Sequence, residues 1–367
     1  MTKVLLVFGT RPEAIKMAPV IRALEGDADR FQKVVCLTAQ HRHLLDQVLE
    51  IFRIRADYDL DLMRANQSPL QVASAVMSGL EPILAAERPD WLLVQGDTTT
   101  VMAAAISGFY HRIKVGHIEA GLRTNDRFQP FPEEVNRRIA SVVTELHFAP
   151  TAQARRNLLV ENVPEGSILV TGNTVIDALQ WASELPYSPV GGPLEAVPWD
   201  KQVILVTAHR RENFGAPLES ICQAVRRLAE EYREGVHFLF PVHPNPNVMS
   251  VVQSALGSAP NVTLTAPLEY LALVHALKLC RFVMTDSGGL QEEAPGLGKP
   301  VLVLRNTTER PEAVDAGTAI LVGTETSPIM EHARLLITDS AVYSRMASAT
   351  NPFGDGKAAQ RIVEALE

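Results

Sequence analysis

The stretch Met284-Thr-Asp-Ser-Gly-Gly-Leu-Gln-Glu-Glu-Ala-Pro-Gly-Leu-Gly-Lys-Pro300 decides the fold class of this chain. A strand-like apolar run ends at Ser287-Gly-Gly289, and a helix is predicted to begin there. The backbone N–H groups at such a helix N-terminus form a ready site for an anion. Two carboxylates, Glu292 and Glu293, follow within a turn, so the predicted anion site has acidic side chains beside it.

The same order of strand and helix repeats along the whole chain. Short apolar runs predict strands at 3–9, 33–39, 91–96, 114–118, 145–149, 202–208, 236–242, 262–265, 282–285 and 301–304. Longer amphipathic runs predict helices at 11–24, 41–52, 69–87, 99–110, 133–143, 217–232, 248–256, 270–279, 289–298 and 329–347. This alternation predicts an α/β protein in which each half is a doubly wound, Rossmann-like parallel sheet.

The length of 367 residues exceeds one ordinary core and predicts two domains. The boundary is expected either near Gly172 or in a linker at 185–200, which holds four prolines and two glycines without a periodic pattern. A turn at 351–356 and a short amphipathic helix follow the second half.

Composition excludes several classes of function. A net charge of −8 argues against nucleic acid as a partner. The apolar run 4–8 is too short for a signal-peptide core, and no run approaches the length of a membrane span. Cys36, Cys222 and Cys280 lie far apart in apolar surroundings, which predicts reduced core residues in a cytoplasmic protein. No pair of cysteines has the spacing of metal ligands, so no metal is expected.

Charged and glycine residues follow the predicted strands in both halves. In open parallel sheets these positions share one edge, where ligands bind, so we expect a central cleft between the two domains. The segments concerned are 9–16, 40–42, 96–100 and 119–123 in the first half, and 209–212, 243–245, 287–289 and 305–310 in the second.

Several of these residues also have purely structural interpretations. Thr10 and Glu13 form a capping box, and Asp97 before three threonines is as consistent with helix capping as with function. Glu119 has no obvious structural role, because it ends an apolar strand and precedes Ala-Gly. His209 is followed by two arginines, which favours a functional role for it.

Two nucleotide-binding signatures are absent. Gly9-Thr-Arg-Pro-Glu13 stands where a dinucleotide-binding G-x-G-x-x-G would follow the first strand, and the chain has no G-x-x-x-x-G-K-[ST] loop. Tyr110-x-x-x-Lys114 matches a dehydrogenase signature, but without the glycine fingerprint we interpret it as a helix end and a strand start. Neither a nicotinamide cofactor nor ATP hydrolysis is expected.

Motifs spread over the chain resemble one family, the non-hydrolysing UDP-N-acetylglucosamine 2-epimerases. They are Phe8-Gly-Thr-Arg-Pro-Glu-Ala-Ile-Lys-Met-Ala-Pro19, Thr38-Ala-Gln-His-Arg42, Gln95-Gly-Asp-Thr-Thr-Thr100, Gly116-His-Ile-Glu-Ala-Gly-Leu-Arg123, Phe131-Pro-Glu-Glu134, Thr171-Gly-Asn-Thr174, Ala208-His-Arg-Arg-Glu-Asn213, Thr285-Asp-Ser-Gly-Gly-Leu-Gln-Glu-Glu293, Thr308-Glu-Arg-Pro311 and Asn351-Pro-Phe-Gly-Asp-Gly356. The resemblance implies a GT-B-like fold with domains at 1–172 and 173–352, and a final helix at about 353–367 that returns to the first domain. It also implies interconversion of UDP-N-acetylglucosamine and UDP-N-acetylmannosamine without a cofactor. A homodimer and a supply of N-acetylmannosamine for cell-surface polysaccharide are further expectations from the resemblance.

The resemblance implies that UDP is bound by Arg11, Leu273, Ser287, Gly288, Gly289, Glu293 and Arg310. The glycines would serve the diphosphate, while Glu293 would accept hydrogen bonds from the ribose hydroxyls. Glu292 is interpreted as a first-turn helix residue. Leu268 and Leu273 depart from the glutamine and phenylalanine that some members have near the uracil.

The resemblance implies an active site formed by Lys16, Asp97, Glu119, Glu133 and His209. The family is understood to expel UDP as C2 loses its proton, giving 2-acetamidoglucal, and then to add UDP back after protonation from the other face. We expect Asp97 and Glu119 to transfer the protons, Glu133 to assist, and His209 and Lys16 to support the leaving UDP.

Some bacterial members bind a second substrate molecule as an activator, at positions that match Gln40, Arg211 and His243. His43 and Asn66 depart from the glutamine and arginine of those members, so the sequence matches the activator site only in part. The rival functions are a GT-B glycosyltransferase, a hydrolysing 2-epimerase and a nucleotide-sugar sensor. A transferase should show fewer acids directed at C2, and a sensor should have lost them.

Overall fold

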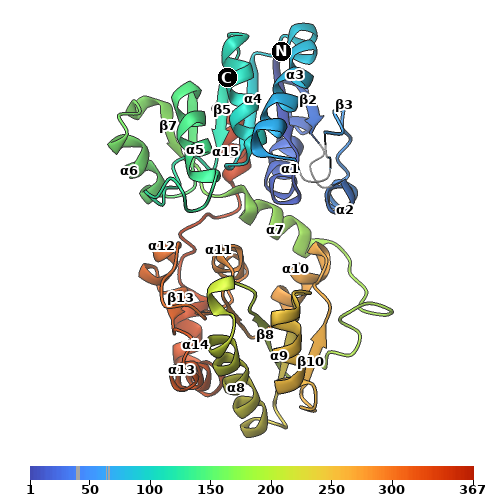
Figure 1. Ribbon diagram of the computed structural model, residues 1–367, viewed down its shortest axis with the longest axis vertical. Helices are drawn as coiled ribbons and strands as arrows, with labels where there is room; N and C mark the ends of the chain where they lie inside the picture. The colour runs from blue at the N-terminus through green and yellow to red at the C-terminus, as the bar shows by residue number, and fades with distance from the viewer. Residues whose placement is uncertain (39–41, 63, 65–66) are drawn as a thin grey trace. The chain divides into compact units, whose positions relative to one another are not determined.

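The computed structural model describes residues 1–38, 42–62, 64 and 67–367. They form two compact units: unit 1 is Met1–Ala178 with Phe353–Glu367, and unit 2 is Leu179–Pro352 (Figure 1). The division runs inside helix α7 (Thr174–Glu184), slightly later than the boundary expected at residue 172. Each unit is an α/β layer built on one parallel sheet.

Among its described residues, unit 1 contains seven strands. They are β1 (Thr2–Phe8), β2 (Phe31–Leu37), β3 (Tyr58–Asp59), β4 (Trp91–Gln95), β5 (Lys114–Ile118), β6 (Leu146–Ala149) and β7 (Ile168–Val170). Its helices are α1 (Arg11–Glu25), α2 (Arg42–Phe52), α3 (Pro69–Glu87), α4 (Thr99–Tyr110), α5 (Glu133–Val143), α6 (Ala152–Val160), the 3₁₀ turn η1 (Glu165–Ser167), the first half of α7, and α15 (Ala358–Glu364).

The sheet of unit 1 has the order β3-β2-β1-β4-β5-β6-β7, with every pairing parallel. The chain order reverses between β1 and β4, where an open parallel sheet offers its binding crevice. Helices α3, α4 and α5 pack side by side on one face, while α1 packs against α2 and α15 on the other (Figure 1). The buried core includes Val4–Phe8 of β1, which have no exposed surface.

Unit 2 contains six strands. They are β8 (Gln202–Thr207), β9 (Val236–Pro241), β10 (Val262–Thr265), β11 (Phe282–Thr285), β12 (Val301–Val303) and β13 (Ala319–Leu321). Its helices are the rest of α7, η2 (Arg211–Asn213), α8 (Ala216–Glu231), α9 (Pro246–Leu256), α10 (Tyr270–Leu279), α11 (Gly288–Gly296), α12 (Pro311–Asp315), α13 (Thr326–Thr338) and α14 (Ser340–Ala347).

The sheet of unit 2 has the order β10-β9-β8-β11-β12-β13, again all parallel. Its switch point lies between β8 and β11, so the segments that follow these two strands meet there. Helix α8 packs against α9 and α13 on one face, and α10 and α11 contact the sheet strands β8 and β11 (Figure 1). The predicted pair of doubly wound parallel sheets is confirmed.

The predicted capping box, linker and buried cysteines are all present in the structure. Thr10 and Glu13 form the capping box of α1, and residues 185–200 contain neither helix nor strand. The three cysteines are buried and unpaired, and burial raises the pKa of each thiol to about 12. Within the described part of the chain, no helix is both long and apolar enough to cross a membrane.

Candidate active site

Glu119 is held at the carboxyl end of β5 by three side chains. Its carboxylate lies 2.6 and 2.7 Å from Lys16 Nζ, and Asn173 Nδ2 donates to Oε1 at 3.0 Å. Gln95 Nε2 donates to Oε2. The residue is buried and has φ +65°, a left-handed conformation that a non-glycine residue seldom adopts. Such strain is concentrated at functional sites, and here it places a carboxylate beside an ammonium group.

Asp97 follows the neighbouring strand β4 and accepts two hydrogen bonds from an arginine of α5. Arg137 donates to Asp97 Oδ2 from Nε at 3.0 Å and from Nη2 at 2.8 Å. The same guanidinium donates from Nη1 to Glu134 Oε2 at 2.7 Å. Asp97 does not cap α4, because Thr98 accepts the hydrogen bond from Val101 N. The fully buried Glu134 fixes the Arg137 guanidinium, and Arg137 in turn orients Asp97, whose side chain is partly exposed.

Glu134 is kept ionised by its surroundings. Burial alone would raise the pKa of its carboxyl, but the Thr124 backbone amide and the Arg137 guanidinium outweigh it and hold the pKa below its ordinary value. Arg138 also contacts Glu134, at 3.2 Å, but its side chain is exposed. The buried Arg137 is therefore the main ionic partner of Glu134.

We expect Arg137→Met to destabilise the protein by about 3 kcal/mol, because it leaves the buried Glu134 carboxylate without its main partner. Arg138→Met is the matched control and should cost less than about 1 kcal/mol, since its ion pair is exposed to solvent. Urea unfolding of the two variants measures both values. Equal losses would contradict the assignment of Arg137 as the buried partner.

The difference in stability between the wild type and Arg137→Met should depend on pH. The folded pKa of Glu134 is lowered, so its stabilising contribution is present above the unfolded pKa, about 4.3, and is lost as the pH falls through the folded value. The stability difference between wild type and Arg137→Met should therefore shrink as the pH drops below about 4.

Two further groups lie near these carboxylates. Glu133 begins α5, and its Oε2 is buried without a hydrogen-bond partner among the described residues. His117 on β5 is fully buried, and this burial lowers its pKa to about 4, so its ring is neutral near pH 7. Its Nε2 lies 2.7 Å from the carbonyl oxygen of Gly96, which can only accept, so we infer that Nε2 carries the proton. His117 thereby ties the end of β5 to the residue before Asp97.

The first turn of α1 contributes both structure and charge. Glu13 accepts from the backbone of Gly9 at 2.9 Å and of Thr10 at 2.7 Å, which confirms its structural interpretation. It also accepts from Thr98 Oγ1 at 2.6 Å, so it joins the segments after β1 and β4. Arg11 lies half-buried at the start of the helix.

In unit 2, Ser287 is the N-cap residue of α11, and it makes no side-chain capping hydrogen bond. Gly288 and Gly289 are the first two helical residues, so their backbone N–H groups lie among the first-turn donors that have no partner within the helix. A Cβ atom on Gly289 would lie 3.5 Å from Glu293 Oε1 and 3.9 Å from Ser287 Oγ. This helix N-terminus therefore combines amides, a hydroxyl and one carboxylate, as an anion attached to a polyol would require.

Arginines and glutamates pair beside this helix. Glu292 is buried in the second turn of α11, where Arg310 Nε donates to its Oε1. The expectation that Glu292 is a first-turn residue was therefore wrong, because α11 begins at Gly288. Arg210 contacts Glu309 at 3.3 Å. Leu273 lies half-buried on α10.

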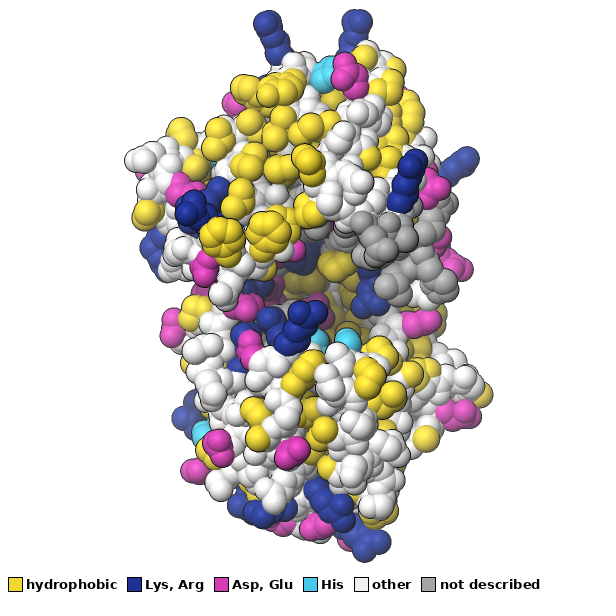
Figure 2. All heavy atoms as spheres, in the orientation of Figure 1, with side chains coloured by type: hydrophobic (Ala, Val, Ile, Leu, Met, Phe, Trp, Pro, Cys, Tyr) yellow, Lys and Arg dark blue, Asp and Glu magenta, His cyan; other side chains and the backbone are white. Residues whose placement is uncertain are grey.

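His209 follows β8 and lies against Asp286, which follows the adjacent strand β11. The distance from His209 Nδ1 to Asp286 Oδ1 is 3.1 Å. The His209 ring stacks on His243, with 5.8 Å between ring centroids and an interplanar angle of 15°. Arg211 lies exposed in η2. Figure 2 shows histidine side chains beside Lys and Arg side chains on this unit.

Three predicted positions cannot be placed. Gln40 and Asn66 lie outside the described residues, and so does the side chain of His43.

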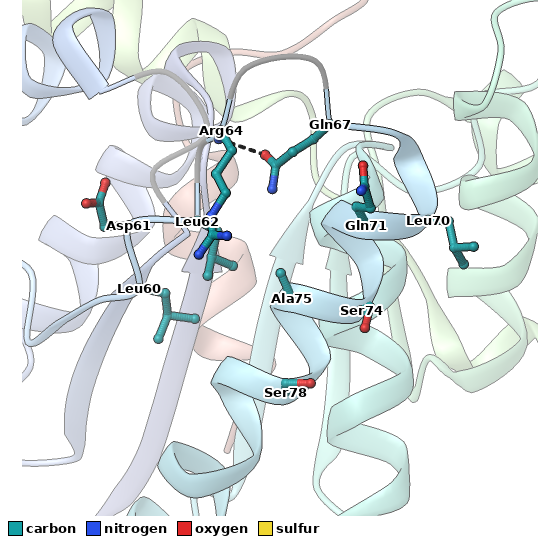
Figure 3. Close-up of a pocket in the computed structure, with 10 residues that line it drawn as sticks. All are labelled: Leu60, Asp61, Leu62, Arg64, Gln67, Leu70, Gln71, Ser74, Ala75 and Ser78. Atoms are coloured by element: carbon teal, nitrogen blue, oxygen red, sulfur yellow. Dashed lines mark hydrogen bonds between the residues drawn. The ribbon is translucent and has the colours of Figure 1, made fainter.

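A cavity of about 670 Å³ lies between the segment after β3 and helix α3 (Figure 3). It contains none of the predicted site residues, and is lined by Leu60, Asp61, Leu62, Arg64, Gln67, Leu70, Gln71, Ser74, Ala75 and Ser78. Over the described ranges, no group of His, Cys, Asp and Glu side chains could hold a metal ion.

Sequence reasoning assigned no role to four residues that hold the site together. They are Gln95, Arg137, Asn173 and Asp286. A signal existed for Arg137, which stands three residues after Glu134 on a predicted helix and so shares its face. Asp286 follows a strand, as the predicted site residues do, but the identity of its partner depends on the pairing of β8 with β11.

Comparison with known proteins identifies the family. Residues 22–367 match the family model for UDP-N-acetylglucosamine 2-epimerase. The UDP-N-acetylglucosamine 2-epimerase of Yersinia pestis is 51% identical over 371 aligned residues, covering 100% of this chain and 98% of the relative. That of Escherichia coli (strain K12) is 50% identical, with 100% and 98% covered. The crystal structure of the Neisseria meningitidis UDP-GlcNAc 2-epimerase bound to UDP-GlcNAc matches with a TM-score of 0.87 at 49% identity, with 100% and 99% covered. The chain therefore belongs to the UDP-N-acetylglucosamine 2-epimerase family.

Proposed function

We propose that this protein interconverts UDP-N-acetylglucosamine and UDP-N-acetylmannosamine by inverting C2 of the sugar. One observation carries the proposal beyond family membership. Asp97 and Glu119 follow the adjacent strands β4 and β5, and each is held by a cation, Arg137 or Lys16. Inversion needs acid–base groups on both faces of a carbon, and two separately oriented carboxylates meet that need.

The proposed reaction breaks the bond between C1 and the diphosphate oxygen. The electron pair of that bond leaves with UDP, while the electrons of the C2–H bond form the C1=C2 double bond and the proton passes to a carboxylate. The carboxyl group on the opposite face then delivers its proton to C2, and the UDP oxygen attacks C1. Elimination avoids the direct removal of a C2 proton that no neighbouring carbonyl acidifies.

We assign the proton transfers to Asp97 and Glu119, with Glu133 assisting them. The buried, unpartnered Oε2 of Glu133 supports a role in which a substrate group completes its hydrogen bonding. Lys16 and His209 support the negative charge of the departing UDP. These groups are the chain's own and require no cofactor.

We assign the nucleotide to the N-terminus of α11. Ser287, Gly288 and Gly289 would hold the diphosphate, and Glu293 would accept from the ribose hydroxyls. Arg11 and Arg310 would contribute positive charge to the phosphates. Leu273 would lie at the uracil.

We also propose that the reaction product feeds the synthesis of cell-surface polysaccharide. We further propose that the protein is a homodimer. Helix α4 ends in the exposed Phe109 and Tyr110, and α5 carries the exposed Val142. Figure 2 shows apolar side chains gathered on this face of unit 1, as an interface between copies would require. Sedimentation of a monomer at micromolar concentration would contradict the dimer.

The test of the function is to incubate the purified protein with UDP-N-acetylglucosamine and follow the sugar by proton NMR. We expect UDP-N-acetylmannosamine to accumulate to a fixed ratio, approached from either sugar. Free N-acetylmannosamine with UDP would indicate a hydrolysing enzyme instead. Unchanged substrate in the presence of bound UDP would favour a glycosyltransferase or a sensor.

We expect Gly288→Ala to weaken UDP binding at least ~10-fold without unfolding the protein. The new Cβ would lie 3.5 Å from Arg210 Nη2, an ordinary contact, so the fold has room for it. The methyl group would, however, occupy the space where the diphosphate approaches the backbone amides. Calorimetric titration with UDP measures the effect.

Gly235→Ala is the matched control, because a Cβ there has no neighbouring atom within 4 Å. It should bind UDP as the wild type does. If both variants bind UDP equally well, the assignment of the diphosphate to the N-terminus of α11 is wrong.

A further inference from the structure

Asp286 is buried and directly follows β11, and one of its two carboxylate oxygens accepts three hydrogen bonds from the chain. Oδ2 accepts from the backbone N–H groups of His209 and Arg210, each at 2.8 Å, and from Asn213 Nδ2 at 3.0 Å. The residue has no exposed surface. These three bonds tie the segment after β8 to the segment after β11, at the switch point of the sheet.

The other oxygen faces a ring nitrogen. Oδ1 lies 3.1 Å from His209 Nδ1. Burial would raise the pKa of Asp286, but the hydrogen bonds from His209 and from the Arg210 backbone outweigh it and lower the pKa below its ordinary value. Oδ1 has no hydrogen-bond partner that meets the angle requirement among the described residues, and its negative charge favours a proton on the adjacent Nδ1. The His209 side chain is 39% exposed, which leaves Nε2 as the nitrogen free to meet a ligand.

We propose that Asp286 is a positioning residue for the epimerisation, which fixes the tautomer and the orientation of His209 so that Nε2 is presented to the departing diphosphate. The inference rests on the proposed function. A proton on Nδ1 leaves Nε2 able to take a second proton, and Asp286 then balances the charge of the imidazolium. The doubly protonated ring donates from Nε2 to a diphosphate oxygen where negative charge develops.

The variant Asp286→Asn separates this role from a structural one. The amide oxygen can replace Oδ2 and keep the three hydrogen bonds that join the two segments. The amide NH₂ group then faces His209 Nδ1 and donates to it, which forces the ring proton onto Nε2. The hydrogen bonds between the two segments are therefore retained, whereas the ring proton of His209 moves from Nδ1 to Nε2.

The experiment measures kcat for the wild type, Asp286→Asn, His209→Gln and the double variant, together with the Kd for UDP. We expect Asp286→Asn to lower kcat by on the order of 10²-fold in the wild-type background. In the His209→Gln background it should lower kcat no further, because the ring that Asp286 positions is gone. Asp339→Asn is the matched control: Asp339 also accepts two backbone N–H groups in unit 2, at 2.9 and 3.0 Å, but contacts no histidine in these bonds, so kcat should not change.

A spectroscopic measurement keeps the proposal testable even if a variant fails to fold. In wild-type protein with 15N-labelled histidine, the His209 signals are assigned by their loss in His209→Gln. We expect a proton on Nδ1, and in Asp286→Asn a proton on Nε2. A neutral wild-type ring protonated only on Nε2, or equal kcat losses in the two backgrounds, would overturn the proposal. Failure of the wild type to epimerise would instead overturn the proposed function, whereas the tautomer would still be measured.

Discussion

Asp97→Asn should lower kcat by about 10²–10⁴-fold while the protein stays folded and binds UDP with unchanged Kd. The amide oxygen can take the place of Oδ2 and still accept from Arg137 Nε and Nη2, so the side chain should keep its orientation. What is lost is the ability to take up or deliver a proton. Steady-state rates and a UDP titration on the same sample separate these two effects.

Asp90→Asn is the control for this substitution. Asp90 precedes β4 whereas Asp97 follows it, and Asp90 Oδ2 accepts from Lys3 N at 2.7 Å. Both variants remove one carboxylate charge from the same unit, at opposite ends of one strand. Only Asp97→Asn should lose activity. A folded Asp97→Asn with near wild-type kcat, or with weakened UDP binding as its main defect, would remove Asp97 from the proton-transfer step.

Glu119→Gln should cost a similar factor in kcat, about 10²–10⁴, and should also reduce stability by about 1–3 kcal/mol. Both carboxylate oxygens accept hydrogen bonds, Oε1 from Asn173 and Lys16 and Oε2 from Gln95 and Lys16. An amide NH₂ group in place of either oxygen would face a donor. The substitution is therefore not conservative at this position, unlike Asp97→Asn.

The stability loss must be separated from the rate loss. Glu161→Gln provides the comparison, because Glu161 is also paired with a cation of unit 1, Arg123, at 2.7 and 2.8 Å. It should lose stability without losing kcat per folded molecule. If Glu119→Gln behaves like Glu161→Gln, then Glu119 is a structural ion pair and the strain at its φ of +65° has no catalytic purpose.

Much of the fold follows from local patterns, and the exceptions have physical causes. The single helix expected at 329–347 is two helices, because Asp339 adopts an extended conformation and caps α14 by accepting from Ala341 N and Val342 N. Strands β3, β7 and β13 were not predicted. They have two, three and three residues, too few to show a period, and they form because the neighbouring strand offers hydrogen-bond partners.

In the site too, contacts between residues close in sequence were predictable, whereas contacts between distant residues were not. The capping box of α1 is a local pattern, and it is confirmed. Arg137 with Asp97 and His209 with Asp286 join residues 40 and 77 positions apart, so their pairing depends on which strands are neighbours. The resemblance to a family supplied candidate residues, whereas the contacts that orient them required the sheet order.

The central claim is that C2 loses its proton as UDP leaves and regains one from the other face. The most direct test is to run the reaction in D₂O from UDP-N-acetylglucosamine and to measure deuterium at C2 in both sugars by NMR. We predict UDP-N-acetylmannosamine that carries deuterium at C2, and deuterium entering the remaining UDP-N-acetylglucosamine as equilibrium is approached. UDP-N-acetylmannosamine that keeps its original C2 proton would contradict the account.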